Sequence, residues 1–294
     1  MTTDVRSARA VTKIIRGQPT SDGDGVRLTR IIGGHNLPDL DPFLLFDEFG
    51  SDSAADYIGG FPNHPHRGFE TVTYMLVGRM RHRDNQGNSG LLVPGSVQWM
   101  TAGRGIVHSE MPEQEQGRMR GFQLWVNLPA RDKMTEPRYQ DIPPEQIRAV
   151  RTAGGAQVRV VAGQFGDVTG AVQGVATAPL YLDVHLPAGA AFEADVPSGH
   201  NAFVYVYEGG ICVDARAGAP TGNNMPAASS TVERGQLAVL GAGDYFSCRA
   251  TDNAQFVVVA GQPLREPIAR HGPFVMNTRQ EIKQAFEDFN AGRF

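Results

Sequence analysis

The chain has 294 residues, of which 41% are hydrophobic and 20% charged, and its formal net charge is -4 at pH 7. This composition indicates a globular protein long enough for two domains. Because Lys and Arg are not clustered, the sequence argues against electrostatic binding of nucleic acid. Two cysteines, Cys212 and Cys248, are too few for a disulfide framework. No run reaches the roughly 20 apolar residues of a membrane span. We therefore expect a soluble, cytoplasmic protein that binds neither membranes nor, directly, nucleic acid.

Short runs of β-branched and aromatic residues follow one another along the chain, each bounded by Gly, Pro or Asp. In chain order they occupy residues 70–78, 90–100, 120–128, 156–163, 180–186, 202–213, 235–243 and 254–261. This spacing predicts an all-β protein built of antiparallel sandwiches or barrels.

The last stretch, residues 278–294, is the one with a clear helical pattern. Thr278 and Glu281 have the spacing of a capping box. Apolar residues then recur at helical intervals, at Ile282, Ala285, Phe286 and Phe289. We expect a short C-terminal α-helix that docks one apolar face on a sheet.

Internal similarity indicates a duplicated β-domain. Residues 70–78 match residues 201–209, and residues 95–103 match residues 235–243, with a strand that runs to a glycine in each pair. The alternative is a chance match between short strand patterns. A polar, proline-bearing stretch at 129–147 offers a boundary, which predicts an N-terminal domain of residues 1–135 and a C-terminal domain of residues 136–294 that ends in the helix.

The two copies differ in histidine content. The overlay pairs His64, His66 and Glu70 with Asp195, Pro197 and Asn201, and pairs His108 and Glu110 with Cys248 and Ala250. Any chemistry of the first copy's histidines is therefore absent from the second, which we interpret as scaffold, interface or lid. Cys248 is interpreted as a small buried apolar residue.

Two segments combine metal-ligand residue types at a spacing of two. Alternate side chains of a strand share a face, so His64 and His66 can point to one place, and so can His108 and Glu110. Three imidazoles and a carboxylate suit Fe(II), Mn, Ni, Cu or Zn, with positions left for water or substrate. The alternative for a single such pair is a polar feature at a strand end.

The remaining histidines show no such pattern. His82 is predicted to be a solvated strand residue, and the others, His35, His185, His200 and His271, are interpreted as structural or exposed. Four large side chains near these segments, Phe43, Phe49, Trp99 and Met100, are interpreted as β-core residues in preference to lining a substrate mouth.

Several stretches resemble the pirin family, a branch of the cupin superfamily. They are "LDPFLLFDEFG" (40–50), "HPHRGFETVTY" (64–74), "GNSGLLVPGSVQWMTAGRGIVHSE" (87–110), "GPFVMNT" (272–278) and the closing "AGRF". The resemblance implies a bicupin of two β-barrels, with Fe(2+) bound only in the N-terminal barrel. The ligands that it implies are His64, His66, His108 and Glu110.

Glu70 leaves an ambiguity, because many cupins take their carboxylate ligand from an HxHxxxE pattern that here ends at Glu70. We expect Glu110 to be the ligand and Glu70 to orient a ligating imidazole. The alternative for Glu70 is a buried partner of Arg67 or of a backbone amide.

The resemblance to bacterial pirins also implies quercetin 2,3-dioxygenase activity, in which a flavonol binds the metal and O2 cleaves its central ring. Glu110 would then serve as the catalytic base if it is loosely held, and Glu70 is the alternative base if it is not a ligand. The alternative, implied by eukaryotic members, is a non-enzymatic, metal-dependent redox sensor that regulates by binding a protein partner.

Overall fold

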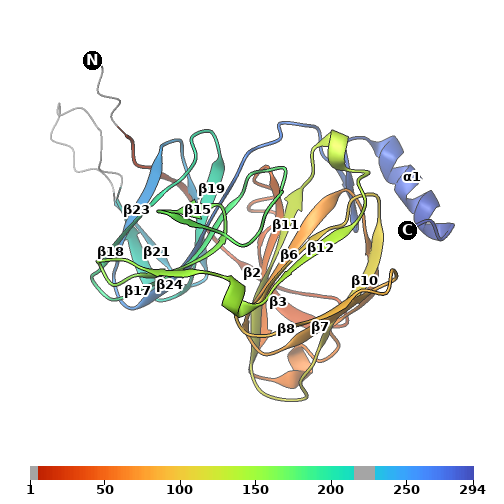
Figure 1. Ribbon diagram of the computed structural model, residues 1–294, viewed down its shortest axis with the longest axis horizontal. Coiled ribbons are helices and arrows are strands. Elements are labelled where there is room, and N and C mark those ends of the chain that lie inside the picture. The colour runs from red at the N-terminus through yellow and green to blue at the C-terminus, as the bar shows by residue number, and fades with distance from the viewer. Residues whose placement is uncertain (1–5, 215–228) are drawn as a thin grey trace. The chain divides into compact units, whose positions relative to one another are not determined.

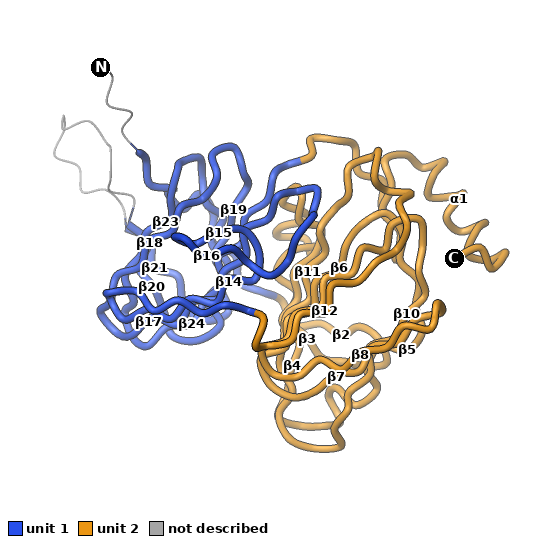
Figure 2. Tube along the Cα trace, in the orientation of Figure 1, with its two compact units in different colours: residues 1–17, 147–263 blue, residues 18–146, 264–294 orange. Residues whose placement is uncertain are grey.

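The computed structural model describes residues 6–214 and 229–294, and nearly all of its regular elements are strands (Figure 1). They form two compact units (Figure 2). The histidine unit consists of residues 18–146 and 264–294, and the companion unit consists of residues 1–17 and 147–263. The predicted all-β class with one C-terminal helix is confirmed. Within the described ranges, no helix has the length and apolar character needed to cross a membrane.

The histidine unit contains two large antiparallel sheets and a two-stranded hairpin. The seven-stranded sheet has the order β12 (Arg138–Ile142), β9 (Val97–Thr101), β6 (Phe69–Val77), β11 (Met119–Asn127), β4 (Phe43–Ser51), β3 (Val26–Ile32) and β2 (Gln18–Asp22). The four-stranded sheet has the order β5 (Phe61–His66), β10 (Ile106–Pro112), β7 (Met80–Asp84) and β8 (Ser89–Leu92). Two short 3-10 helices, at Ala54–Asp56 and Ala130–Asp132, connect strands of this unit, and a third, at Pro144–Gln146, follows its last strand β12.

The companion unit repeats this arrangement. Its seven-stranded sheet has the order β1 (Val11–Arg16), β22 (Gln236–Leu240), β19 (Asn201–Glu208), β24 (Ala254–Gly261), β17 (Leu180–Leu186), β14 (Gln157–Ala162) and β13 (Ala149–Arg151). Its four-stranded sheet has the order β18 (Ala191–Asp195), β23 (Tyr245–Ala250), β20 (Gly210–Val213) and β21 (Ser230–Glu233). A small hairpin, β15 (Gln164–Phe165) and β16 (Val168–Thr169), completes it.

The pairing registers of the two units also correspond. Val72 of β6 pairs with Trp99 of β9, and the residues that the sequence overlay places on them, Phe203 and Val239, pair with each other in β19 and β22. A chance match of strand patterns would not reproduce both the strand order and the register. The structure therefore supports the duplication.

The compact units differ from the expected domain split at both ends. The stretch expected to be a linker contains β12, which pairs with β9, and the first unit continues to residue 146. Strand β1 near the N-terminus pairs with β22 and so belongs to the companion unit. Local sequence does not reveal either assignment, because each edge strand pairs with a segment distant in the chain.

The C-terminal helix belongs to the histidine unit and not, as expected, to the second domain. α1 (Arg279–Asn290) has the predicted capping box between Thr278 and Glu281. Its buried residues, Ile282 and Ala285, pack on Phe274 and Met276, which belong to the hairpin of β25 (Ala269–His271) and β26 (Phe274–Met276). This apolar contact brings residues 264–294 into the unit that carries the histidines.

Candidate metal centre

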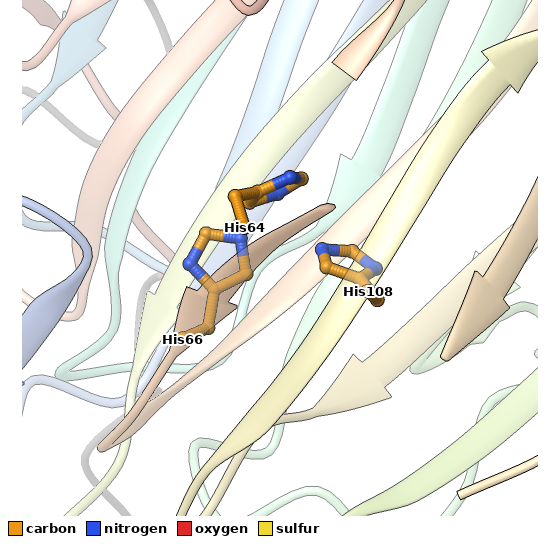
Figure 3. Close-up of side chains that lie close together, drawn as sticks. All are labelled: His64, His66 and His108. Atoms are coloured by element: carbon orange, nitrogen blue, oxygen red, sulfur yellow. The ribbon is translucent and has the colours of Figure 1, made fainter. Parts of the chain in front are cut away.

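Two neighbouring strands of the four-stranded sheet bring the histidines together. Antiparallel pairing of β5 and β10 sets His108 opposite His64, while Ile106 is opposite His66. The ring centroids are 4.7 Å apart for His64 and His66, 4.5 Å for His64 and His108, and 5.1 Å for His66 and His108 (Figure 3). One nitrogen from each ring lies within 4.8 Å of the other two. We call these residues the histidine cluster.

The ring nitrogens of the cluster are suited to a metal. Nδ1 of His64 lies 2.8 Å from the Pro62 carbonyl oxygen, to which it donates if it carries the proton, leaving Nε2 as an electron-pair donor. Nδ1 of His66 and both nitrogens of His108 are buried without a hydrogen-bond partner among the described residues. Buried polar atoms are rarely left unpaired in native proteins. The unpaired nitrogens therefore fit a bound ion.

Burial also sets the charge of the cluster. Desolvation, followed by the proximity of His64, lowers the pKa of both His66 and His108 well below the ordinary value. A lowered histidine pKa keeps the imidazole neutral near pH 7, and a neutral imidazole has the lone pair that a metal needs.

The glycine that follows the motif is required by the backbone. Gly68 has φ of +88°, and a Cβ at this position would lie 2.0 Å from the Val275 carbonyl oxygen. The chain makes this turn between His66, the last residue of β5, and Phe69, the first residue of β6. A side chain would therefore both strain the turn and displace β26.

Arg67, which lies between His66 and Gly68, is held by hydrogen bonds to other parts of the unit. It is 3% exposed, and its Nε donates to the Arg104 carbonyl oxygen. Its Nη1 donates to Oδ2 of Asp288 in α1 at 2.7 Å. The arginine of the motif thus fixes β5 to the C-terminal helix.

Glu110 lies two residues after His108 and is 3% exposed. It is not part of the group of donor atoms within 4.8 Å of one another. Its Oε1 accepts a 2.8 Å hydrogen bond from Oγ1 of Thr73. A register shift between His108 and Glu110 sets Glu110 opposite Phe61 on β5. Glu110 as fourth ligand therefore stays a prediction.

Glu70 does not orient an imidazole, and that expectation is corrected. Phe69 of β6 packs on His66 with ring centroids 5.0 Å apart, and Glu70, as the next residue of the strand, points to the opposite face. Its Oε1 accepts a 2.7 Å hydrogen bond from Oγ1 of Thr101. Burial raises the pKa of Glu70. The turn at Gly68 breaks the strand parity that had linked Glu70 to the histidines.

His82 is buried, contrary to the prediction of a solvated residue. It is 1% exposed, and its Nε2 lies 3.0 Å from Oδ2 of Asp141. Its ring stacks on Tyr139 with centroids 5.1 Å apart. The pattern "RMRHRD" around it suggested exposure, but β7 pairs with β10 and thereby faces His82 inward. The remaining histidines, His35, His185, His200 and His271, are not part of the cluster.

A cavity of about 480 Å³ lies beside the cluster within the histidine unit. Its lining includes His64, His66 and Glu110, the apolar side chains of Leu28, Leu45, Phe49, Phe61 and Trp125, and the polar side chains of Asp22, Arg30, Asp47, Gln123 and Arg270. This is the size and the mixed lining of a small-molecule site.

Most of the residues that line the cavity were not predicted from the sequence. Trp125 contacts His66 with ring centroids 5.2 Å apart, and the Arg270 guanidinium carbon lies 4.9 Å from the centre of the Trp125 ring. Of the side chains considered as mouth residues, Phe49 lines the cavity, whereas Trp99 is buried on the opposite face of the sheet, since it pairs with Val72. The alternation of side chains between the two faces of β11 was the sequence signal that could have predicted the position of Trp125.

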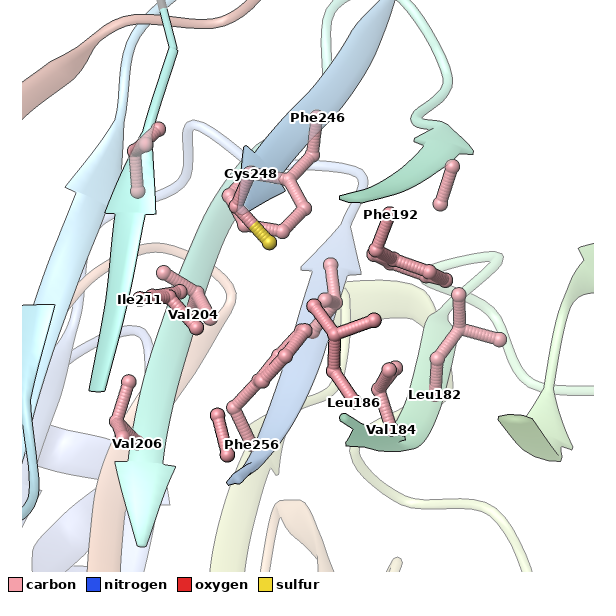
Figure 4. Packing of buried hydrophobic residues seen from close by; sticks show 14 of the residues in the cluster. Leu182, Val184, Leu186, Phe192, Val204, Val206, Ile211, Phe246, Cys248 and Phe256 are labelled. Carbon is pink, nitrogen blue, oxygen red and sulfur yellow. The ribbon is translucent and has the colours of Figure 1, made fainter. Parts of the chain in front are cut away.

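The companion unit contains no comparable group among its described residues. Pairing of β18 with β23 sets Phe192 opposite Cys248, as His64 is opposite His108. The counterpart of His64 is therefore Phe192 and not Asp195, because the loop that follows β18 is longer than the turn at Gly68. Apolar side chains, among them Phe246 and Phe256, fill this interior (Figure 4).

Cys248 is 1% exposed within that apolar cluster, as the sequence predicted. Burial raises the pKa of its thiol far above neutral pH. A protonated thiol is a poor metal ligand. The companion unit is therefore a packed scaffold at the place where the histidine unit has its site.

Together, the fold and the cluster define a two-domain β-barrel protein that has, among its described residues, one cluster of three histidines suited to a metal ion. The pirin family model matches residues 25–126, and the model of the pirin C-terminal cupin domain matches residues 181–294. The chain belongs to the pirin family.

Relatives cover nearly the whole chain. A pirin-like protein of Caulobacter vibrioides is 52% identical over 97% of this chain and 99% of its own, and human pirin is 43% identical over 96% and 93%. A crystal structure of quercetin 2,3-dioxygenase from Acinetobacter baumannii has a TM-score of 0.87 at 34% identity, covering 98% of this chain and 99% of that one.

Proposed function

We propose that the chain is an iron-dependent dioxygenase that cleaves a flavonol such as quercetin with O2. The observation that carries the proposal is the histidine cluster, with its unpaired buried nitrogens, beside a cavity of about 480 Å³ that His64 and His66 line. Similarity to the Acinetobacter baumannii quercetin 2,3-dioxygenase supports the reaction. His64, His66, His108 and Glu110 would hold Fe(2+), and Mn, Ni, Cu and Zn suit the same donors.

The cavity supplies the remaining requirements of the reaction. When bound, the metal provides a Lewis acid for an enol oxygen and a redox centre for O2. Glu110 lines the cavity and would accept the proton of the enol hydroxyl as general base if the metal holds its carboxylate only loosely. Trp125 and Phe49 offer apolar faces on which a planar ring system packs and from which water is excluded.

The test begins with the metal content of protein purified without added metal, and then uses anaerobically iron-loaded protein. Quercetin is added, O2 is admitted and oxygen uptake is followed. His108→Ala should abolish both metal retention and turnover, because His108 is a member of the cluster.

The matched control is His200→Ala. His200 lies in the companion unit and its Nε2 contacts the Ala178 carbonyl oxygen at 3.1 Å, so this variant should keep both properties. Absence of turnover with several metals and several flavonols would contradict the proposed enzyme and favour the alternative, a metal-dependent regulator that binds a protein partner.

A further inference from the structure

Glu110 is held by a chain of hydrogen bonds that crosses the interior of the histidine unit. Oγ1 of Thr73 in β6 lies 2.8 Å from Oε1 of Glu110 in β10 and 2.6 Å from Oε1 of Gln123 in β11. Thr73 is 1% exposed. The contact therefore connects the two sheets where water cannot easily replace it.

The number of available protons determines which group donates in each of these hydrogen bonds. A threonine hydroxyl has one proton to donate, and an ionised Glu110 can only accept. The hydroxyl of Thr73 must then donate to Glu110 and accept from its other neighbour. Gln123 presents its Oε1, a second acceptor, to Thr73, and a 180° flip of the side-chain amide brings the nitrogen to that place, from which Gln123 can supply the proton. The order is Gln123 amide N–H to Thr73 oxygen, and Thr73 O–H to Glu110 Oε1.

We propose that Thr73 and Gln123 are positioning residues for Glu110, holding its Oε1 so that Oε2 is the oxygen offered to the metal. This inference rests on the proposed function, but it concerns only the metal site. Carboxylate ligands are oriented by hydrogen bonds in the same way in other metal sites. Gln123 lines the cavity, so these hydrogen bonds also connect the Glu110 carboxylate to the cavity wall that a substrate would contact.

The experiment measures Co²⁺ affinity and the visible absorption of the Co²⁺ protein, neither of which requires turnover. Thr73→Val keeps the shape of the side chain and removes its hydroxyl, and Thr73→Ser keeps the hydroxyl. Loss of an orienting partner weakens metal binding by about 10- to 100-fold. We expect that loss, with an altered spectrum, for Thr73→Val, and near wild-type behaviour for Thr73→Ser.

A double-mutant cycle separates positioning from general packing. If Thr73 acts through Glu110, adding Thr73→Val to Glu110→Gln should cause no further loss of affinity. If the two losses add, Thr73 acts through the fold and the proposal is overturned. Gln123→Leu, which leaves both Thr73 and Glu110 in place, should give a smaller loss of the same kind, and keeps the test available should Thr73→Val not fold.

The result distinguishes this inference from the function it rests on. Wild-type protein that binds Co²⁺, with binding lost in His108→Ala, establishes the metal site. Thr73→Val with wild-type affinity and spectrum would then overturn the positioning role while leaving the site intact. Wild-type protein that binds no Co²⁺ would overturn both.

Discussion

Nη1 of Arg67 lies 2.7 Å from Oδ2 of Asp288, so that the residue after the second cluster histidine is tied directly to α1. The Arg67 guanidinium carbon also lies 4.4 Å from the centre of the Phe294 ring. The histidine cluster on β5 and β10 is thus supported by residues near the C-terminal end of the chain. The C-terminal segment is therefore part of the frame that supports the cluster.

Asp288→Ala should lower the free energy of unfolding by about 1.5–3 kcal/mol, because it leaves the buried Arg67 charge without its carboxylate. Urea denaturation measures this. The control is Glu287→Ala, whose pair with Lys283 is exposed at 3.7 Å and should contribute less than about 0.5 kcal/mol. Equal effects of the two substitutions would contradict the assignment.

The same pair predicts an acid dependence. Its hydrogen bond with Arg67, and next that with Arg293, lowers the pKa of Asp288 below its ordinary value of 3.8. The stabilisation is therefore complete above that pH and is lost as the pH falls below it. The stability difference between wild type and Asp288→Ala should shrink in acid, and a constant difference down to pH 2 would count against the ion pair.

Lys133 is a buried cation, 1% exposed, that donates to the carbonyl oxygens of Gly68 at 2.8 Å and Val275 at 3.0 Å and to Oδ1 of Asn127 at 2.7 Å. Lys133→Met would leave three acceptors unpaired and should lower the free energy of unfolding by about 2–4 kcal/mol. Lys283→Met, an exposed substitution, is the control and should be nearly neutral.

Burial lowers the pKa of Lys133 from 10.5 to about 8. Between these values the unfolded chain binds a proton that the folded chain does not, so the free energy of unfolding rises with pH from about 8 to 10.5. The advantage of wild type over Lys133→Met should grow across this interval. Parallel stability curves for the two proteins would show that Lys133 titrates normally.

Trp125 should determine the binding of planar ligands. With zinc-loaded protein, Trp125→Ala should weaken flavonol binding by about 10-fold or more, because an aromatic wall beside His66 is removed. Isothermal titration calorimetry measures the affinity, and metal content should stay unchanged. Trp99→Phe alters the other tryptophan, which does not line the cavity, and should bind flavonol normally.

Cys248→Ala tests the companion unit. The thiol lies in an apolar interior, so the substitution should cost about 1–2 kcal/mol of stability as a small cavity. The metal content per chain should not change, because the counterparts of the cluster histidines are apolar. A drop in metal content would indicate a second site that involves this cysteine.

The sequence by itself determined the histidine cluster, the all-β class, the duplication and the capped helix. The histidine pair and the helix depend on a local period: alternation along one strand places His64 with His66, and the i, i+3 and i+4 intervals define the apolar face of α1. The duplication is visible because two distant segments repeat one pattern. His108 joined them by prediction because a second segment carried the same ligand types.

Only the tertiary structure decided the boundaries of the units, the face of Glu70, the burial of His82 and the walls around Trp125. These depend on which distant strands pair and on backbone turns such as that at Gly68, which resets the parity of the strand that follows it. The hydrogen bond from Thr73 to Glu110 joins two sheets, and no local pattern encodes a contact made by residues 37 apart.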